Sequence, residues 1–341
     1  MAHVEKRGPG RWRARYRDPE GREKSRTFER KVDAENFLDS VRGELVHGTY
    51  IDPDASRQTF ESFADEWAAA QDWKATSAES WRYVRARLVP LLGRLPLGSI
   101  DLLTLQGAQR KLGTEYARTT VETTMSYAGS IMRAAHASGR VGRDPTRGLK
   151  APKARADEPS GKVGPDQVPT RLEAVTILGA GPRPYRAAVA LGFAGLRIGE
   201  VLGMADDRID GREVTVDQQV QRVDGHLVLT TPKAEKVRTI EVPDAVVMEL
   251  RRHLRDHMRG GTSLLFGGPR SRRATDKPGC AHVDGDVCGL AMRRDQFYVL
   301  AWHPSLVGAG LPKDRYNFHG ARHFAASSLL AEGAPLAAVA G

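Results

Sequence analysis

Five side chains from three separate stretches of the chain could together bind a phosphodiester and move protons on it. Arg197 and Glu200 lie three residues apart in GLRIGE, and His319 and Arg322 lie three apart in HGARH. Lys233 lies between these motifs, in TPKAEKVRTIEVP. The planar arginine fork can hold two phosphate oxygens at once, whereas histidine and lysine can donate or accept protons. These residue types therefore predict chemistry at a phosphate group.

Two expected helices position the arginines. Arg197 follows the apolar run GFAGL and precedes a helical pattern over 198–204, so a bend there would aim its guanidinium into a cleft. Glu200 is one helical turn further on, close enough to orient Arg197. His319 and Arg322 would share one face of the second helix. A surface arginine in front of an amphipathic helix is the simpler alternative for the first motif.

The sequence also predicts how the second helix begins and packs, and where Lys233 lies. Asn317 could cap the start of the helix, and Leu329 and Leu330 predict that its other side is buried. Lys233 follows a proline and is expected in a hairpin whose second strand is VRTIEV. Arg238 and Lys236 are alternatives to Lys233 nearby, and a solvated hairpin charge is the simplest interpretation.

The order and spacing of these motifs resemble the tyrosine recombinases, the phage integrase family. By that resemblance Arg197 and Arg322 would clamp the pentavalent phosphate and Glu200 would brace the arginine pair. Lys233 would act as general acid, and His319 would serve in acid–base or phosphate contact. The implied reaction is attack by a tyrosine hydroxyl on one DNA strand, giving a 3′-phosphotyrosyl link. It requires no metal, ATP or other cofactor.

The sequence also departs from the family pattern. The family carries its nucleophilic tyrosine several turns after the second arginine, but none of the eight tyrosines here follows Arg322. Tyr316 precedes the helix and is expected to pack or stack rather than to act as nucleophile. Gly320 and Ala321 stand where the family usually has a larger pair. We therefore expect a catalytic domain that is truncated at its C-terminus, in a chain that binds DNA but does not cleave it.

Composition predicts a globular protein of two or three domains. The chain has 341 residues, of which 40% are hydrophobic and 28% charged. It has no membrane-length apolar run and no secretory signal at its N-terminus. Cys280 and Cys288 are its only cysteines and form no disulfide framework, so a reducing cytoplasm is expected.

The net charge of +10 is concentrated in two stretches and favours nucleic acid as the partner. Residues 1–30 and residues 140–155 each carry a net charge of +5. Binding through them should weaken steeply with salt, because each neutralised phosphate releases counterions. A solvated basic tail and linker are the alternative. The expected DNA-binding residues are Arg11, Arg13, Arg15, Arg17, Arg143, Arg147, Lys150 and Lys153.

The fold expected from these patterns is multidomain and mainly α, with small β elements. Residues 1–55 read as a three-stranded sheet plus a helix, similar to the arm-binding domain of phage integrases. Residues 56–140 read as helices, similar to the family's core-binding (SAM-like) domain, with Thr76 or Ser77 and Ser99 or Asp101 as possible caps. Residues 141–164 read as a basic linker, and 165–341 as an α+β catalytic domain.

The family resemblance also implies binding partners, and two alternative functions stay open. The implied partner is double-stranded DNA at attachment sites, bound as a tetramer in an intact form, with possible accessory DNA-bending or excision factors. One rival is a non-catalytic DNA-binding remnant, and a less favoured one is a type IB topoisomerase. His253 and His257 are interpreted as surface histidines rather than zinc ligands. Cys280, His282 and Cys288 are interpreted as part of a variable basic loop.

Overall fold

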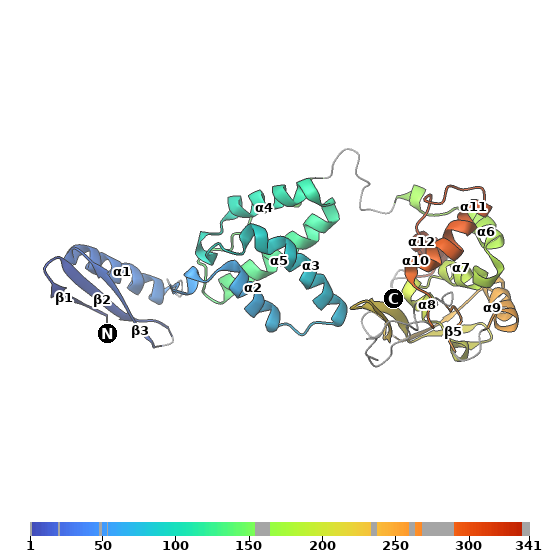
Figure 1. Ribbon diagram of the computed structural model, residues 1–341, viewed down its shortest axis with the longest axis horizontal. Coiled ribbons are helices and arrows are strands. Elements are labelled where there is room, and N and C mark those ends of the chain that lie inside the picture. Colours follow the sequence, from blue (N-terminus) through green and yellow to red (C-terminus); the bar gives the residue numbers. More distant parts are fainter. Residues whose placement is uncertain are drawn as a thin grey trace. The chain divides into compact units, whose positions relative to one another are not determined.

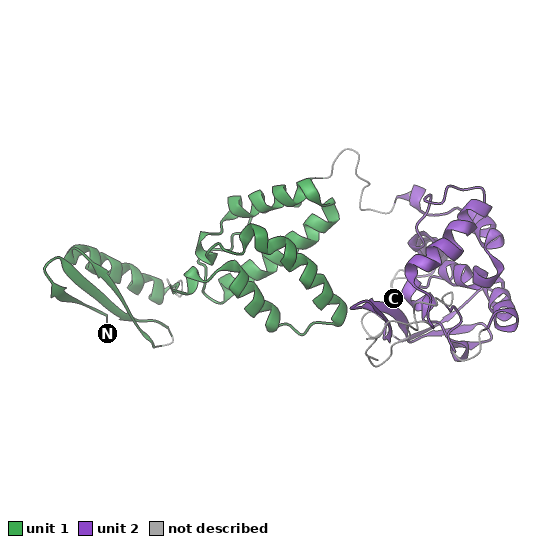
Figure 2. Cartoon of the chain, in the orientation of Figure 1, with its two compact units in different colours: residues 1–158 green, residues 159–341 purple. Residues whose placement is uncertain are grey.

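The protein is described by a computed structural model that is mainly helical with small antiparallel sheets (Figure 1), as the sequence predicted. The structure describes residues 2–19, 21–47, 50–52, 54–153, 164–232, 237–258, 263–267 and 290–335. The chain divides into two compact units (Figure 2), unit 1 at residues 1–158 and unit 2 at residues 159–341. Among the described residues, no helix has the length and apolarity needed to cross a membrane.

Unit 1 begins with a small sheet that is covered on one face by a helix (Figure 1). Its elements are β1 (His3–Gly8), β2 (Arg11–Arg17), β3 (Glu23–Phe28) and α1 (Lys31–Val46). The strands are antiparallel in the order β1-β2-β3. Side chains alternate along a strand, so Ala14 and Tyr16 are buried in the cluster that includes Leu38 and Val41 of α1. The arginines of β2 therefore lie on the opposite face of the sheet.

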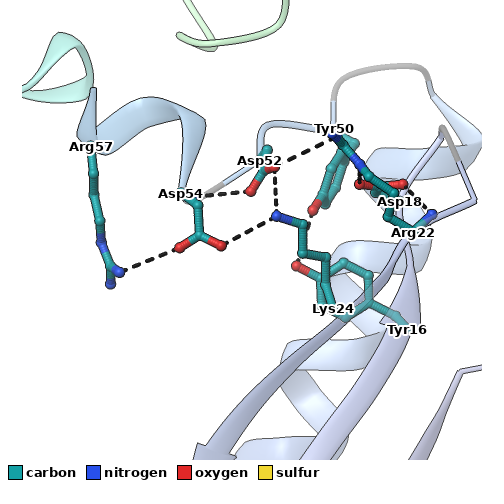
Figure 3. Close-up of polar contacts among 8 residues, drawn as sticks. All are labelled: Tyr16, Asp18, Arg22, Lys24, Tyr50, Asp52, Asp54 and Arg57. Carbon is teal, nitrogen blue, oxygen red and sulfur yellow. Dashed lines mark hydrogen bonds and ion pairs between the residues drawn. The ribbon is translucent and has the colours of Figure 1, made fainter. Parts of the chain in front are cut away.

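A polar network fixes the segment that contains Tyr50, Asp52, Asp54 and Arg57 to this sheet (Figure 3). The ammonium of Lys24, on β3, lies 2.8 Å from Asp52 and 3.2 Å from Asp54. Arg57 in turn lies 3.4 Å from Asp54. The side chains of Lys24 and Asp52 are only 21% and 15% exposed, so this ion pair is better shielded from solvent than an ordinary surface pair.

Tyr16 and Asp18 extend the network on the other side (Figure 3). The hydroxyls of Tyr16 and Tyr50 are 3.0 Å apart, and burial together with this hydrogen bond raises the pKa of Tyr50. Asp18 accepts hydrogen bonds from the backbone N–H and the side chain of Arg22. The segment that contains Tyr50 is thus bound to the sheet by both charged and neutral contacts.

The second part of unit 1 is a four-helix arrangement: α2 (Phe60–Ala69), α3 (Ala75–Leu92), α4 (Leu102–Glu115) and α5 (Arg118–Ala137). Its core includes Phe60, Leu88 and Met132, all fully buried. Asp101 caps α4 by accepting from the N–H of Thr104, as expected. The expected cap of α3 is wrong: the helix starts at Ala75 with Lys74 at its N-cap, because the chain turns helical before Thr76 and Ser77.

Unit 2 packs helices around one core and places small sheets at its edge. Its helices are α6 (Arg171–Ala180), α7 (Arg186–Phe193), α8 (Ile198–Leu202), α9 (Asp244–Asp256), α10 (Arg294–Phe297), α11 (His303–Gly308) and α12 (His319–Ala331). A π-helical turn (Tyr298–Trp302) joins α10 to α11. Almost all of α7 is buried, so the helices beside it are held against a rigid centre.

The strands of unit 2 correct one expectation from the sequence. They are β4 (Ile209–Asp210), β5 (Glu213–Val216), β6 (Gln219–Val223), β7 (His226–Thr230) and β8 (Arg238–Glu241). β6 pairs with β7, whereas β8 pairs with β5 in the order β4-β5-β8. The expected hairpin of TPKAEKVRTIEVP is therefore wrong, because its two flanking strands belong to different sheets. Alternating side chains identify a strand but not its partner.

Candidate functional site

Arg197 lies at the junction between α7 and α8, where the chain changes direction. Gly195 has φ +95°, a conformation that side chains rarely adopt, and it allows the turn that ends α7. Arg197 is extended and occupies the N-cap position of α8. Glu200 accepts from the backbone N–H of Arg197 at 2.8 Å and from its Nη1 at 2.9 Å. The expected contact between these two side chains is present.

Glu200 is also held by a second arginine, which sequence reasoning had considered only as an alternative to Lys233. Arg238 donates from Nη1 to one oxygen of Glu200 at 3.1 Å and from Nη2 to the other at 2.7 Å. Glu200 is completely buried. Burial alone would raise the pKa of this carboxyl, but the hydrogen bonds of Arg238 and Arg197 outweigh it, so the pKa is lowered. Glu200 is therefore ionised at neutral pH.

Arg322 on α12 brings a third guanidinium to the same place. Its Nη1 donates to the carbonyl of Gly195, directly before the Arg197 turn. Burial lowers the pKa of Arg322, and the positive charges of Arg197 and Arg238 lower it further, while Glu200 opposes them. Arg197 and Arg322 thus interact electrostatically, although they are 125 positions apart in the sequence.

His319 is the first residue of α12. The N-cap residue of this helix is Phe318, but the side chain of Asn317 accepts from the N–H of Gly320 at 3.0 Å and so supplies the expected capping contact. Burial lowers the pKa of His319, and electrostatic interactions with His323, Arg322 and Arg197 lower it further. The imidazole is therefore neutral at pH 7 and could accept a proton if an anion entered.

These side chains form what we call the arginine cluster: Arg197, Glu200, Arg238, His319 and Arg322. Three guanidiniums and one carboxylate leave two positive charges when His319 is neutral. In the part of the chain that the structure describes, Arg197 uses only Nη1 and Arg322 only Nη1 in side-chain hydrogen bonds. Both therefore keep donors for an oxyanion. Lys233 and Lys236 lie outside the described residues.

Small residues at the start of α12 allow a close approach to the chain before α6. A Cβ on Gly320 would lie 2.9 Å from the carbonyl of Gln167, and Ala321 is fully buried. A Cβ on Gly192 of α7 would overlap the ring of Phe318. The Gly320-Ala321 pair, unusual beside the family pattern, therefore fits its surroundings in this chain.

Tyr316 is engaged away from the cluster in a hydrogen bond to α6. It is buried, and its hydroxyl donates to Glu173 at 3.0 Å. Burial and this carboxylate raise its pKa. The second half of α12 differs from expectation: Leu329 and Leu330 are 48% and 42% exposed. Their apolar pattern predicted a packed face, but none of the described elements covers it.

The arginines of β2 are unequally occupied. Arg15 is paired with Glu5 and Glu23 at 3.6 and 3.1 Å, so much of its charge is compensated. Arg13 has a buried Nε without a hydrogen-bond partner among the described residues. Arg11 and Arg17 are exposed, and Arg17 donates to the carbonyl of Gly21.

The basic stretch after α5 is accessible to a ligand. Its cations Arg143, Arg147, Lys150 and Lys153 are all exposed. Arg143 and Arg147 line a cavity of about 1050 Å³ between the segment that contains Ile51 and the end of α5. The carbonyl of Lys150 accepts a hydrogen bond from the side chain of Gln109 on α4, which fixes the chain there.

One of the two histidines that were discounted as zinc ligands is buried. His253 is buried rather than on the surface. Its Nε2 donates a hydrogen bond to the carbonyl of Leu265 at 2.7 Å, and its ring packs on Phe266. Cys280, His282 and Cys288 lie outside the described residues. Across the described ranges, no group of three or more His, Cys, Asp or Glu side chains could hold a metal ion.

Comparison with known proteins identifies the parts of unit 1. Residues 3–47 match the family model for the phage integrase N-terminal domain, and residues 60–152 match that for the phage integrase central domain. These are phage integrase domains. No curated protein sequence matches the chain.

Solved structures show that the phage integrase resemblance extends to the fold of unit 2. The Tn1549 transposon integrase in complex with transposon right end DNA is 17% identical with a TM-score of 0.65, over 83% of this chain and 90% of that one. A lambda integrase dimer bound to a COC′ core site is 16% identical with a TM-score of 0.55, over 97% and 88%. The fold is that of the tyrosine recombinases.

Proposed function

We propose that the chain binds double-stranded DNA and holds one backbone phosphodiester between Arg197 and Arg322, as part of phage-integrase-type site-specific recombination. The observation that carries this proposal is the arginine cluster, with two uncompensated positive charges and unused donors on both guanidiniums. A phosphodiester carries one negative charge and two non-bridging oxygens, which two arginine forks can hold.

With a tyrosine hydroxyl as the attacking nucleophile, the cluster would stabilise the charge that develops during phosphoryl transfer. Arg197 and Arg322 would neutralise the non-bridging oxygens as the phosphorus becomes pentavalent. His319, which is neutral and interacts electrostatically with both arginines, would contact the phosphate or move a proton. Lys233 would protonate the leaving oxygen. Glu200 would brace the arginines, with no direct contact to DNA, because it is completely buried.

Unit 1 would supply most of the affinity through backbone phosphates. The exposed cations of residues 143–153 and Arg11, Arg13 and Arg17 of β2 are the residues that we propose for these contacts. The lambda integrase also appears as a tetramer bound to a Holliday junction. By analogy we propose assembly on DNA in the cytoplasm, where accessory bending factors could take part.

We further propose that these 341 residues bind DNA without cutting it. Tyr316, the tyrosine nearest to His319 in the sequence, donates a hydrogen bond from its hydroxyl to Glu173. The hydroxyl of Tyr298 accepts from the backbone of Phe318. Neither hydroxyl contacts the arginine cluster, so neither is placed as its nucleophile.

One experiment tests binding and cleavage together. The chain would first select duplexes from a random pool, and its binding sites on them would be mapped by footprinting. The same duplexes would then be prepared with a nick in one strand, which traps any covalent protein–DNA intermediate. We expect salt-sensitive binding, with the logarithm of affinity falling linearly with that of salt concentration, and no covalent adduct. A protein–DNA adduct would refute the cleavage proposal, and salt-independent binding would refute the phosphate contacts.

The footprints and adducts, together with a relaxation assay on supercoiled DNA, separate a type IB topoisomerase from the other two functions. A non-catalytic DNA-binding protein gives footprints without adduct, as we expect for these residues. A type IB topoisomerase would relax supercoiled DNA without a site-specific footprint. The match of residues 3–47 to a phage integrase N-terminal domain favours the integrase over the topoisomerase.

A further inference from the structure

We infer that Arg238 is a positioning residue of the arginine cluster, which fixes Glu200 so that Arg197 keeps its free donors for the phosphate. The inference rests on the proposed function, because it concerns how the same site holds its anion. Arg238 lies on β8 and Arg197 at the start of α8, so the two arginines reach Glu200 from separate elements.

The hydrogen bonds divide the two arginines into different tasks. Arg238 commits both Nη atoms to Glu200, one to each carboxylate oxygen. Its side chain is only 19% exposed. Arg197 gives one side-chain N–H to the carboxylate and is 39% exposed. Arg238 is therefore occupied by the carboxylate, whereas Arg197 is available to a ligand.

Removing Arg238 would change what Glu200 does with Arg197. A buried carboxylate must be compensated, and a carboxylate and a guanidinium prefer a two-pronged arrangement. Without Arg238, the freed oxygens of Glu200 would draw a second N–H from Arg197. The arginine needed for the phosphate would then be withdrawn into the ion pair.

Loss of the positive charge of Arg238 would also weaken phosphate binding. With Arg238 the cluster holds three guanidiniums against one carboxylate, and without it only two. One uncompensated charge would remain to meet the anion instead of two. Electrostatic attraction for a phosphodiester would therefore fall even if Arg197 did not move.

Lysine should not replace Arg238 fully. β8 pairs with β5, with Arg238 opposite Val216, so the backbone at this position is fixed. A lysine ammonium there is a single point charge and cannot bond both oxygens of Glu200 in the plane of the carboxylate. The lysine variant therefore separates the effect of charge from the effect of geometry.

The test uses the full chain and a defined probe, thymidylyl-(3′→5′)-thymidine, which contains a single phosphodiester. Binding is followed by NMR of the His319 ring, assigned by its loss in His319→Asn. The variants are Arg238→Met, Arg238→Lys, Glu200→Gln and the double variant Glu200→Gln with Arg238→Met. Arg212→Met is the matched control, because this exposed arginine pairs with Glu241 and Asp244 outside the cluster.

We expect Arg238→Met to weaken probe binding at least about tenfold, as for loss of a charge-assisted contact, and Arg212→Met to leave it unchanged. Arg238→Lys should bind the probe more weakly than the wild type. In the Glu200→Gln background the effect of Arg238→Met should shrink, because the two residues act through each other. An additive double variant, or a lysine variant equal to the wild type, would overturn the inference.

Two controls distinguish a failure of this inference from a failure of the proposed function. If the wild type and Arg322→Ala respond alike to the probe, the proposed phosphate site itself is wrong, and the inference falls with it. If the wild type binds and Arg238→Met binds equally, only the inference is wrong. Should Arg238→Met fail to fold, as judged by the His253 signal of the buried core, Arg238→Lys still decides between charge and geometry.

Discussion

Glu200 shows how a single buried carboxylate can support a cationic site. It removes one positive charge from the cluster, but it fixes the backbone and side chain of Arg197 and the fork of Arg238. The fixed orientation matters for phosphate recognition, because that recognition depends on where the N–H groups point. At the residue scale, His319 and Gly320 offer the most direct tests of this arrangement.

The titration of His319 should make anion binding pH-dependent. Its pKa lies below the ordinary value of 6.5, so it gains a proton only as the pH falls below that value. Protonation adds a positive charge to the cluster, and we expect dinucleotide affinity to rise as the pH is lowered from 7 to about 5. His319→Asn should lose this increase, and His3→Asn in unit 1 should keep it.

Lowering the pH should reduce folding stability, whereas it should raise anion affinity. Because the folded pKa of His319 is lowered, the unfolded chain binds more protons between the two pKa values. The free energy of unfolding therefore falls as the pH falls through the pKa that His319 has in the unfolded chain.

Anion affinity supplies the decisive comparison. If the pH profile of affinity is unchanged in His319→Asn, this ring lies outside the electrostatic field of the anion.

Gly320 should be intolerant of even one methyl group. Its added Cβ would lie 2.9 Å from the carbonyl of Gln167, so we expect Gly320→Ala to destabilise unit 2 by about 1–3 kcal/mol. Gly179 in α6 is the matched control, because a Cβ there meets nothing within 4 Å. Gly179→Ala should be neutral or stabilising by up to about 1 kcal/mol. Hydrogen exchange of unit 2 peptides measures both, and equal effects would contradict the close approach.

At the scale of elements, local patterns predicted more than pairings did. The alternation of β2 and the apolar stripes of α3 and α5 identified those elements, since each pattern reports on one buried face. The pairing of β8 with β5 was missed, because the contacts that select a partner are distant in the sequence. Arg238 was undervalued for the same reason: its partner Glu200 lies 38 residues away.

The network between β3 and the segment that contains Asp52 and Asp54 can be tested at this scale. Lys24→Met removes the cation between Asp52 and Asp54, and we expect it to destabilise the sheet by about 1–2 kcal/mol and to speed hydrogen exchange in that segment. Lys31→Met is the matched control. Its i,i+4 pair with Glu35 is exposed and should contribute less than about 0.5 kcal/mol. Equal losses would show that the network is no stronger than a surface pair.

The same network sets a pH window. Burial would raise the pKa of Asp52, but its hydrogen bond and ion pair with Lys24 outweigh this and lower it. The contribution of Asp52 is therefore complete above its unfolded pKa of about 3.9 and is lost as the pH falls through the folded value. In Lys24→Met this acid sensitivity should decrease.

At the scale of the whole molecule, the two units contribute different things to one proposed task. Unit 1 carries both basic stretches of the sequence on phage integrase domains, and unit 2 carries the arginine cluster. Charge and composition could predict a nucleic-acid partner, since they need no tertiary contacts. They could not predict which arginines of β2 are compensated, because Glu5 and Glu23 meet Arg15 only across the sheet.

The two-sided grip on Glu200 also constrains the order in which unit 2 can assemble. Arg197 and Glu200 are neighbours on α8, but the second guanidinium arrives only when β8 has docked beside β5. Until then, drawing the carboxylate out of water would leave it with one counter-ion, which is costly. We expect Glu200 to stay hydrated in early intermediates, so that the arginine cluster is among the last features to form and fragments that end before β8 lack it.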